Sequence, residues 1–190
     1  MLNVTARQEL MRTIVDTLGV VVEEARLDFG KDGLSVRVVD PSHVAMIKME
    51  VDSAAFETWE IDETQLGLEM RKLTGILGQG GAGDMVELAY NDESGQATIK
   101  IGRIDLNLRP LDNTTLNPPN VPSLELPCGV TIAGSELAKA LRATKLVGDL
   151  VNLSLTKSAF AVNVKGPTDS VNVEFSKDEL VAIDCNEDAR

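Results

Sequence analysis

Residues 1–38 read MLNVTARQELMRTIVDTLGVVVEEARLDFGKDGLSVRV. The β-prone segment 2–6 predicts a short strand, and 7–18 predicts a helix because apolar residues recur every fourth position on one face. Residues 25–38 predict a hairpin, since two alternating stretches flank Gly-Lys-Asp-Gly at 30–33. The order strand, helix, hairpin is the unit from which the fold is built.

The same order returns after residue 128. A strand at 130–133, a helix at 135–146 and a hairpin at 151–164 are predicted by the same patterns. Four residues of the first copy recur 127 positions later, as Ala133, Glu136, Leu137 and Thr144. This repetition indicates a diverged duplication, with chance matching of a few residues as the alternative.

Between the copies, residues 112–127 are rich in proline and asparagine, which is typical of an extended linker. We therefore expect a first domain at 1–111, the linker at 112–127 and a second domain at 128–190. If the repeat is faithful, the second domain is incomplete, short by roughly 50 residues.

The rest of the first copy predicts one more helix, at 70–77, among many short strands. The expected strands are 46–51, 57–61, 66–68, 85–90, 97–101 and 104–109. Further strands are expected at 170–175 and 180–183 in the second copy. The fold class predicted is α+β, with two duplicated domains of antiparallel sheet carrying a few helices.

Composition narrows the function classes. Apolar residues make up 43% of the chain, enough for packed cores, and no apolar run approaches the roughly 20 residues of a membrane span. The first residues lack a basic-then-apolar leader, so no secretion signal is expected. Cys128 and Cys185 lie outside any CxxC motif, which disfavours structural zinc and predicts reduced thiols.

The net charge of −12 argues against nucleic-acid binding unless the cations are segregated onto one surface. Seven of the 18 basic residues lie in or beside the three predicted helices: Arg7, Arg12, Arg71, Lys72, Lys139, Arg142 and Lys145. These seven are the candidate DNA contacts, through phosphates and without base specificity. The alternative interpretation is that they only solvate helix faces.

Several segments, in order along the chain, resemble the proliferating cell nuclear antigen family of sliding clamps, nearest its archaeal members. They are VVDPSHVAM at 38–46, AAF at 54–56 with WE at 59–60, LGL at 66–68, VPSLEL at 121–126, and the helix ending in LVGD at 149. Arg12, Lys139 and Arg142 match basic positions of the family. Gly75 and Gly78 stand where its members often carry lysine.

The resemblance implies a homotrimeric ring around double-stranded DNA, with helices lining the hole and sheets outside. Subunits would join head to tail through edge strands carrying Ile104, Leu106 and Leu108 in one copy and Val171, Val173 and Phe175 in the next. It implies a processivity factor that works in the archaeal cytoplasm, associated with the nucleoid.

The resemblance also implies a pocket for a short peptide motif of DNA polymerase, clamp loader, flap endonuclease and DNA ligase. Its residues would be Val39, Asp40, His43, Val44, Met46, Val121, Pro122 and Leu124. The alternative is that these are ordinary loop and core residues.

An enzyme is not indicated. The GxGxxG at 78–83 follows a helix and precedes a strand, the reverse of its order in dinucleotide-binding folds. His43 is the only histidine, so no metal site, cofactor or catalytic dyad is expected. The competing class is a clamp-related scaffold or regulatory variant that binds proteins without encircling DNA.

Overall fold

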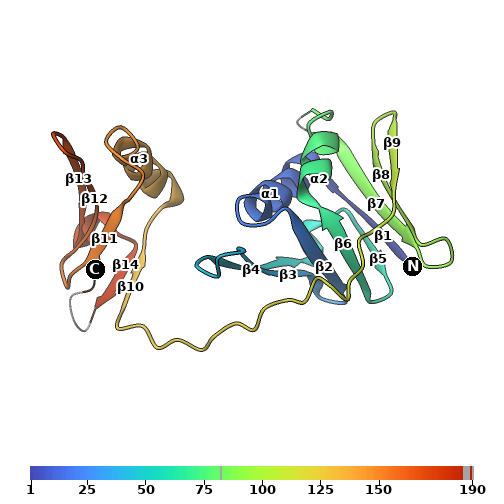
Figure 1. The fold of residues 1–190 in the computed structure, drawn as a ribbon, viewed down its shortest axis with the longest axis horizontal. Helices are drawn as coiled ribbons and strands as arrows, with labels where there is room; N and C mark the ends of the chain where they lie inside the picture. The colour runs from blue at the N-terminus through green and yellow to red at the C-terminus, as the bar shows by residue number, and fades with distance from the viewer. Residues whose placement is uncertain (82, 186–188, 190) are drawn as a thin grey trace. The chain divides into compact units, whose positions relative to one another are not determined.

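The computed structural model describes residues 1–81, 83–185 and 189 (Figure 1). The chain forms two compact units, Met1–Val121 and Pro122–Arg190, and the division falls within the segment 112–127. The first unit contains, in order, β1 (Leu2–Arg7), α1 (Gln8–Gly19), β2 (Glu24–Gly30), β3 (Gly33–Val39), β4 (Met46–Asp52), η1 (Ser53–Ala55), β5 (Thr58–Ile61), β6 (Thr64–Glu69), α2 (Met70–Leu77), β7 (Met85–Asn91), β8 (Gln96–Ile101) and β9 (Ile104–Leu108).

Two antiparallel sheets make up the first unit. One has the strand order β5-β1-β7-β8-β9 and the other β4-β3-β2-β6. Buried residues alternate with half-buried or exposed ones in β2 and β3 of the second sheet and in β1 of the first, which gives each sheet one apolar face. The β2–β3 turn depends on Gly33, whose φ is +146° and where a Cβ would lie 2.1 Å from the Val51 carbonyl oxygen.

Helices α1 and α2 pack side by side against these apolar faces (Figure 1). Each buries one stripe in the core of the unit: Met11, Ile14, Val15 and Leu18 from α1, and Met70, Leu73, Ile76 and Leu77 from α2. Burial of such side chains contributes roughly 1.5–3 kcal/mol each. The helices are thereby fixed with their polar faces directed away from the core.

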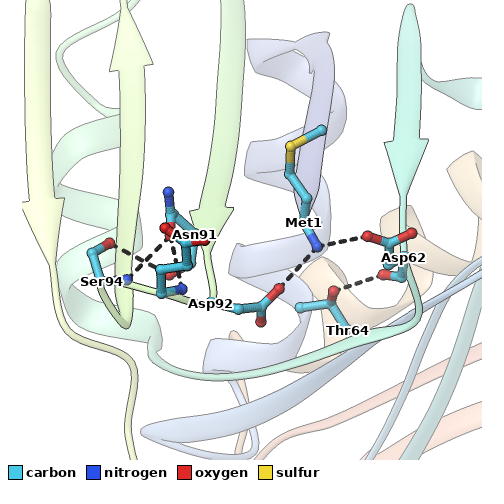
Figure 2. A network of polar contacts seen from close by, with 7 residues as sticks. Met1, Asp62, Thr64, Asn91, Asp92 and Ser94 are labelled. Atoms are coloured by element: carbon cyan, nitrogen blue, oxygen red, sulfur yellow. Dashed lines mark hydrogen bonds and ion pairs between the residues drawn. The ribbon is translucent and has the colours of Figure 1, made fainter.

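The chain begins inside a polar network that joins two turns to β1. Figure 2 shows the Met1 α-ammonium donating to Asp62 and to Asp92, each at 2.9 Å. Hydrogen bonds with Asp92 and Asp62 raise the pKa of the Met1 α-amino group above its ordinary value. Any stabilisation from this group is therefore complete below its ordinary pKa and is lost as the pH rises through the raised value.

The second unit repeats the first half of the first unit, element by element. It contains β10 (Cys128–Thr131), α3 (Gly134–Thr144), β11 (Asn152–Leu155), β12 (Ala159–Lys165), β13 (Ser170–Ser176), η2 (Lys177–Glu179) and β14 (Ala182–Cys185). Strands β11-β12-β13 pair as β2-β3-β4 do, and β10 pairs with β14 as β1 pairs with β5. The predicted duplication and α+β class are confirmed.

The two units differ in what covers the repeated elements. In the first unit β6 pairs with the outer edge of β2 and β7 pairs with β1. Among the described residues of the second unit, β10 has β14 as its one strand partner, and β11 has β12 plus an isolated bridge from Leu155 to Ala189. The second core is correspondingly small, centred on Phe160, Val162 and Phe175.

Element boundaries differ from the predicted ones at a few places. Arg7 is the N-cap of α1 rather than its first residue, with an extended backbone. The predicted strand 180–183 is displaced, because η2 occupies 177–179 and β14 begins at Ala182. In the part of the chain that is described, no helix has the length and hydrophobicity needed to cross a bilayer.

The prediction of reduced thiols is wrong. Cys128 and Cys185 form a disulfide across 57 residues of sequence. Cys128 is the first residue of β10 and Cys185 the last of β14, and the antiparallel register places them directly opposite each other. Their spacing in the sequence could not show this, because the register comes from the packing of the whole unit.

We expect reduction of this disulfide to destabilise the second unit by about 4 kcal/mol, because the unfolded chain regains the entropy that closure of a loop of this length removes. Amide hydrogen exchange of β12, where Val162 is fully buried, measures that loss in wild-type protein with and without reductant. Equal protection in both states would contradict the structural role of the bond.

Two controls separate this effect from general unfolding. The variant C128S/C185S should behave like reduced wild type and be insensitive to reductant. The only tryptophan and the only tyrosine, Trp59 and Tyr90, lie in the first unit. Trp59 fluorescence should therefore show an unchanged unfolding transition for that unit.

Candidate nucleic-acid interface

The exposed faces of α1 and α2 carry cations side by side. Burial of the apolar stripes leaves Arg12 on the solvent face of α1, and Arg71 and Lys72 on that of α2. Arg7, at the N-cap of α1, is also exposed. The four basic residues predicted in the first unit thus lie on, or at the start of, two helices that pack against each other.

Helix α3 shows the same division in the second unit. Ala140 and Thr144 are buried, while Lys139, Arg142 and the C-cap residue Lys145 are exposed. Arg142 and Lys145 lie at the C-terminal end, where cations interact favourably with the helix dipole. All seven predicted basic residues are therefore accessible to solvent.

The charges of the three helices oppose those of the remaining chain. With their cap residues Arg7, Glu69 and Lys145, they hold seven cations and four carboxylates, a net charge of +3. Since the whole chain carries −12, the other residues carry −15. The helices of each unit thus carry a surplus of positive charge, opposite in sign to the rest of the chain.

Several of these cations have a carboxylate partner. Arg12 Nε lies 3.2 Å from Asp16 Oδ2, Lys72 Nζ lies 2.5 Å from Glu69 Oε1, and Lys139 Nζ lies 2.6 Å from Glu136 Oε1. Arg7 Nε lies 3.5 Å from Glu57 Oε1. These partners were not predicted from the sequence, although the i,i+3 and i,i+4 spacings along the helices and their caps indicate three of them: Asp16, Glu69 and Glu136.

The loop between β3 and β4 is held by one carboxylate. Asp40 Oδ1 accepts from the backbone N–H groups of Val44 (2.7 Å) and Ala45 (2.6 Å), and Oδ2 accepts from the Ser42 N–H (3.0 Å) and hydroxyl. These hydrogen bonds, that of the Ser42 hydroxyl first, hold the pKa of Asp40 far below its ordinary range. His43 takes a positive φ of 57° within this loop, and Val44 is 86% exposed.

The family model of proliferating cell nuclear antigen, N-terminal domain, matches residues 1–105. The chain belongs to this family. The DNA polymerase sliding clamp of Methanosarcina barkeri is 32% identical over 188 residues, which cover 98% of this chain and 77% of that protein. That of Haloarcula marismortui is 30% identical over 184 residues, covering 95% and 74%.

Solved structures agree with this assignment. The PCNA of A. fulgidus, with the C-terminal region of FEN-1 bound, matches with a TM-score of 0.91 and 30% identity over 99% of this chain and 76% of that chain. The PCNA of Entamoeba histolytica matches with a TM-score of 0.86 and 19% identity, over 98% and 78%, which shows the shared fold. The resemblance to archaeal clamps is confirmed.

Leu111 and the start of the linker are fixed to β6 in this PCNA-family chain. Leu111 N–H donates to the Gly67 carbonyl at 2.8 Å, and Asn113 Nδ2 donates to the Gln65 carbonyl at 2.8 Å. A Cβ on Gly67 would lie 2.7 Å from Leu116 Cδ1 and 3.0 Å from the Leu111 carbonyl oxygen, so the missing side chain lets this segment approach β6 closely.

A hollow of about 150 Å³ lies between the linker and the strands β2 and β3. Leu116 and Pro119 line it together with Val39, the one predicted pocket residue among the described residues that border this hollow. The other predicted pocket residues include half-buried Met46 and exposed His43, Val44, Val121, Pro122 and Leu124. Leu116 and Pro119 were missed because linker composition alone does not show which residues turn toward a strand.

The strands predicted to join subunits are edge strands of their sheets. β9 ends the five-stranded sheet and β13 ends the three-stranded one. Ile104 is exposed and Leu106, Leu108, Val171 and Val173 are half-buried. Phe175 differs: its ring packs on Phe160 inside its own unit, with ring centroids 6.1 Å apart, so only its backbone is available for pairing.

At α2 the two glycines noted in the sequence have different surroundings. A side chain at Gly75 would meet nothing within 4 Å, whereas one at Gly78 would approach the Thr74 carbonyl oxygen at 3.2 Å. Packing therefore does not exclude a lysine at Gly75. Among the described residues, no group of three or more His, Cys, Asp or Glu side chains is arranged to hold a metal ion.

We expect the substitution D40A to loosen the β3–β4 loop. Three backbone N–H groups lose a charged acceptor, so exchange of the Val44 and Ala45 amides should accelerate by about tenfold or more. D52A is the matched control, since Asp52 accepts from the Ala54 N–H in a different turn. Because the pKa of Asp40 is depressed, wild-type protection should persist at about pH 4. Equal exchange in D40A and D52A would contradict this organising role.

Proposed function

We propose that this chain is a protomer of a DNA sliding clamp, a non-enzymatic processivity factor that encircles duplex DNA and tethers replication and repair proteins to it. The observation that carries the proposal is the net charge of +3 on the three helices, in a chain whose other residues carry −15. The family membership and the sliding-clamp function of its relatives support the same conclusion.

The basic side chains act by meeting phosphates rather than bases. Arg12, Arg71 and Arg142 present guanidinium groups on exposed helix faces, which suit phosphate oxygens and carry no sequence information. A contact of this kind is equivalent at every step along the duplex. The protein therefore slides, and its retention comes from enclosure of the DNA rather than from affinity.

Enclosure requires copies of the chain to assemble. The free edges of β9 and β13 are two different surfaces, so their antiparallel pairing between neighbours is heterologous and closes into a ring when the rotation allows. We propose a homotrimer, in which Ile104, Leu106 and Leu108 of one copy meet Val171 and Val173 of the next.

Client proteins dock on the β3–β4 loop and the linker. The β3–β4 loop presents exposed Val44 and His43, and the linker supplies exposed Val121, Pro122 and Leu124. A short helical turn with one aliphatic and two aromatic anchors fits such a surface. The A. fulgidus PCNA with the C-terminal region of FEN-1 bound supports this proposal.

The clients are a DNA polymerase, the clamp loader, a flap endonuclease and DNA ligase. The protein then works on chromosomal DNA, at the nucleoid in the cytoplasm of an archaeal cell.

We expect the triple variant R12E/K139E/R142E to be loaded onto DNA at least about tenfold less efficiently than wild type, because three phosphate contacts become repulsive. The protein is loaded with an archaeal clamp loader and ATP onto nicked circular plasmid and separated by gel filtration in high salt. Wild type should stay bound to the circle and be released when the plasmid is linearised. A scaffold that does not encircle DNA would show no dependence on circularity, which would overturn the proposed function.

The matched control for this experiment is K31E/K157E/K165E. It makes the same change in net charge, with one substitution in the first unit and two in the second, at exposed positions outside the helices. It should be loaded like wild type. If both triple variants lose loading equally, the effect comes from net charge alone. That result would contradict the assignment of Arg12, Lys139 and Arg142 as DNA contacts.

We expect V44A to weaken binding of a peptide carrying one aliphatic and two aromatic anchors by about 1 kcal/mol, roughly fivefold in Kd. Val44 is 86% exposed, so its loss should leave the fold unchanged. V20A is the control, since Val20 is 84% exposed at the end of α1. Isothermal titration showing equal affinities for V44A, V20A and wild type would exclude Val44 from the docking surface.

A further inference from the structure

Three of the seven helix cations share one arrangement. Arg12, Lys72 and Lys139 each form an ion pair with a carboxylate about one turn away: Asp16, Glu69 and Glu136 respectively. Two of these pairs lie within a helix and the third joins α2 to its N-cap residue. The arrangement occurs on all three helices, in both units.

The ion pairs of these carboxylates contribute little to the fold, although Glu69 and Glu136 also lie at helix N-termini, where a negative charge is favourable. Their side chains are between 36 and 48% exposed, and exposed ion pairs at this spacing contribute little to stability. Asp16 lies in the last turn of α1, where the helix dipole disfavours a negative charge and no basic residue is present. Helix stability therefore gives no account of Asp16.

The carboxylates do act on the cations. Without them the three helices and their caps would carry a net charge of +6, and the three carboxylates reduce it to +3. A phosphate that approaches Lys72 or Lys139 competes with a carboxylate 2.5 or 2.6 Å from the ammonium nitrogen. The free energy needed to displace that carboxylate offsets part of the attraction between the cation and the DNA phosphate.

We propose that Asp16, Glu69 and Glu136 are built-in counterions that weaken the grip of Arg12, Lys72 and Lys139 on DNA phosphates. This inference rests on the proposed clamp function. It states that these carboxylates determine how strongly the clamp contacts DNA phosphates. Each step of sliding must break and remake phosphate contacts. A carboxylate that replaces the departing phosphate stabilises the cation between contacts and lowers the cost of the step.

The test is the triple variant D16N/E69Q/E136Q, which removes the charges and keeps the side-chain shapes. Binding to a short linear duplex is measured by fluorescence anisotropy over a series of salt concentrations. We expect about twofold tighter binding for each carboxylate removed, about tenfold in all. The plot of log K against log salt should steepen by up to about 0.9 for each uncovered cation.

The control is E63Q/E93Q/D169N, which changes the same residue types, two in the first unit and one in the second. Among the described residues, these carboxylates form no ion pair and lie outside the helices. Control binding should stay within about twofold of wild type. Equal affinity and slope in the two triple variants would overturn the inference.

Retention on nicked circular plasmid distinguishes this inference from the proposed function. If wild type is retained but the two triple variants bind the short duplex alike, the clamp function stands and the counterion role fails. If wild type shows no retention that depends on circularity, the clamp function itself fails. In single-molecule tracking, D16N/E69Q/E136Q should also diffuse more slowly along DNA than E63Q/E93Q/D169N.

Discussion

Burial of the apolar stripes of α1 and α2 determines where the charges of the first unit point. Side chains such as Ile14, Leu18 and Leu73 contribute roughly 1.5–3 kcal/mol each when buried. An exposed ion pair such as Arg12 with Asp16 contributes at most about 1 kcal/mol. Hydrophobic packing therefore fixes the helix orientation, and the cations occupy the face that remains.

This hierarchy explains how an acidic chain presents cationic surfaces. At physiological ionic strength a charge is screened over about 8 Å, so a phosphate beside a helix responds mainly to the residues of that helix face. The surplus of carboxylates elsewhere affects solubility and long-range approach more than local contact. A net charge of −12 excludes phosphate binding only when the charges are evenly mixed.

The parts of this structure that follow from local pattern were predictable. The spacing of Leu10, Ile14 and Leu18 gave α1, and its repetition after residue 128 gave α3 and the duplicated architecture. The seven exposed cations followed from the same periodicity. Features that depend on register were not predictable: the partner of Cys128, the burial of Phe175 and the side chains of Leu116 and Pro119 that face β2 and β3. Their partners lie many residues away, and no local signal specifies them.

The two copies of the repeated unit stabilise the pairing of their first strand with their last strand in different ways. In the first, β1 lies between β5 and β7, and Leu2 and Ile61 form the first pair of the β1–β5 ladder, with Leu2 fully buried. In the second, Cys128 and Cys185 hold the corresponding place at the start of β10 and the end of β14. A ladder of two four-residue strands is marginal by itself. In the first unit, burial stabilises the pairing of β1 with β5. In the second unit, β10 has one strand partner among the described residues, and the disulfide constrains its pairing with β14.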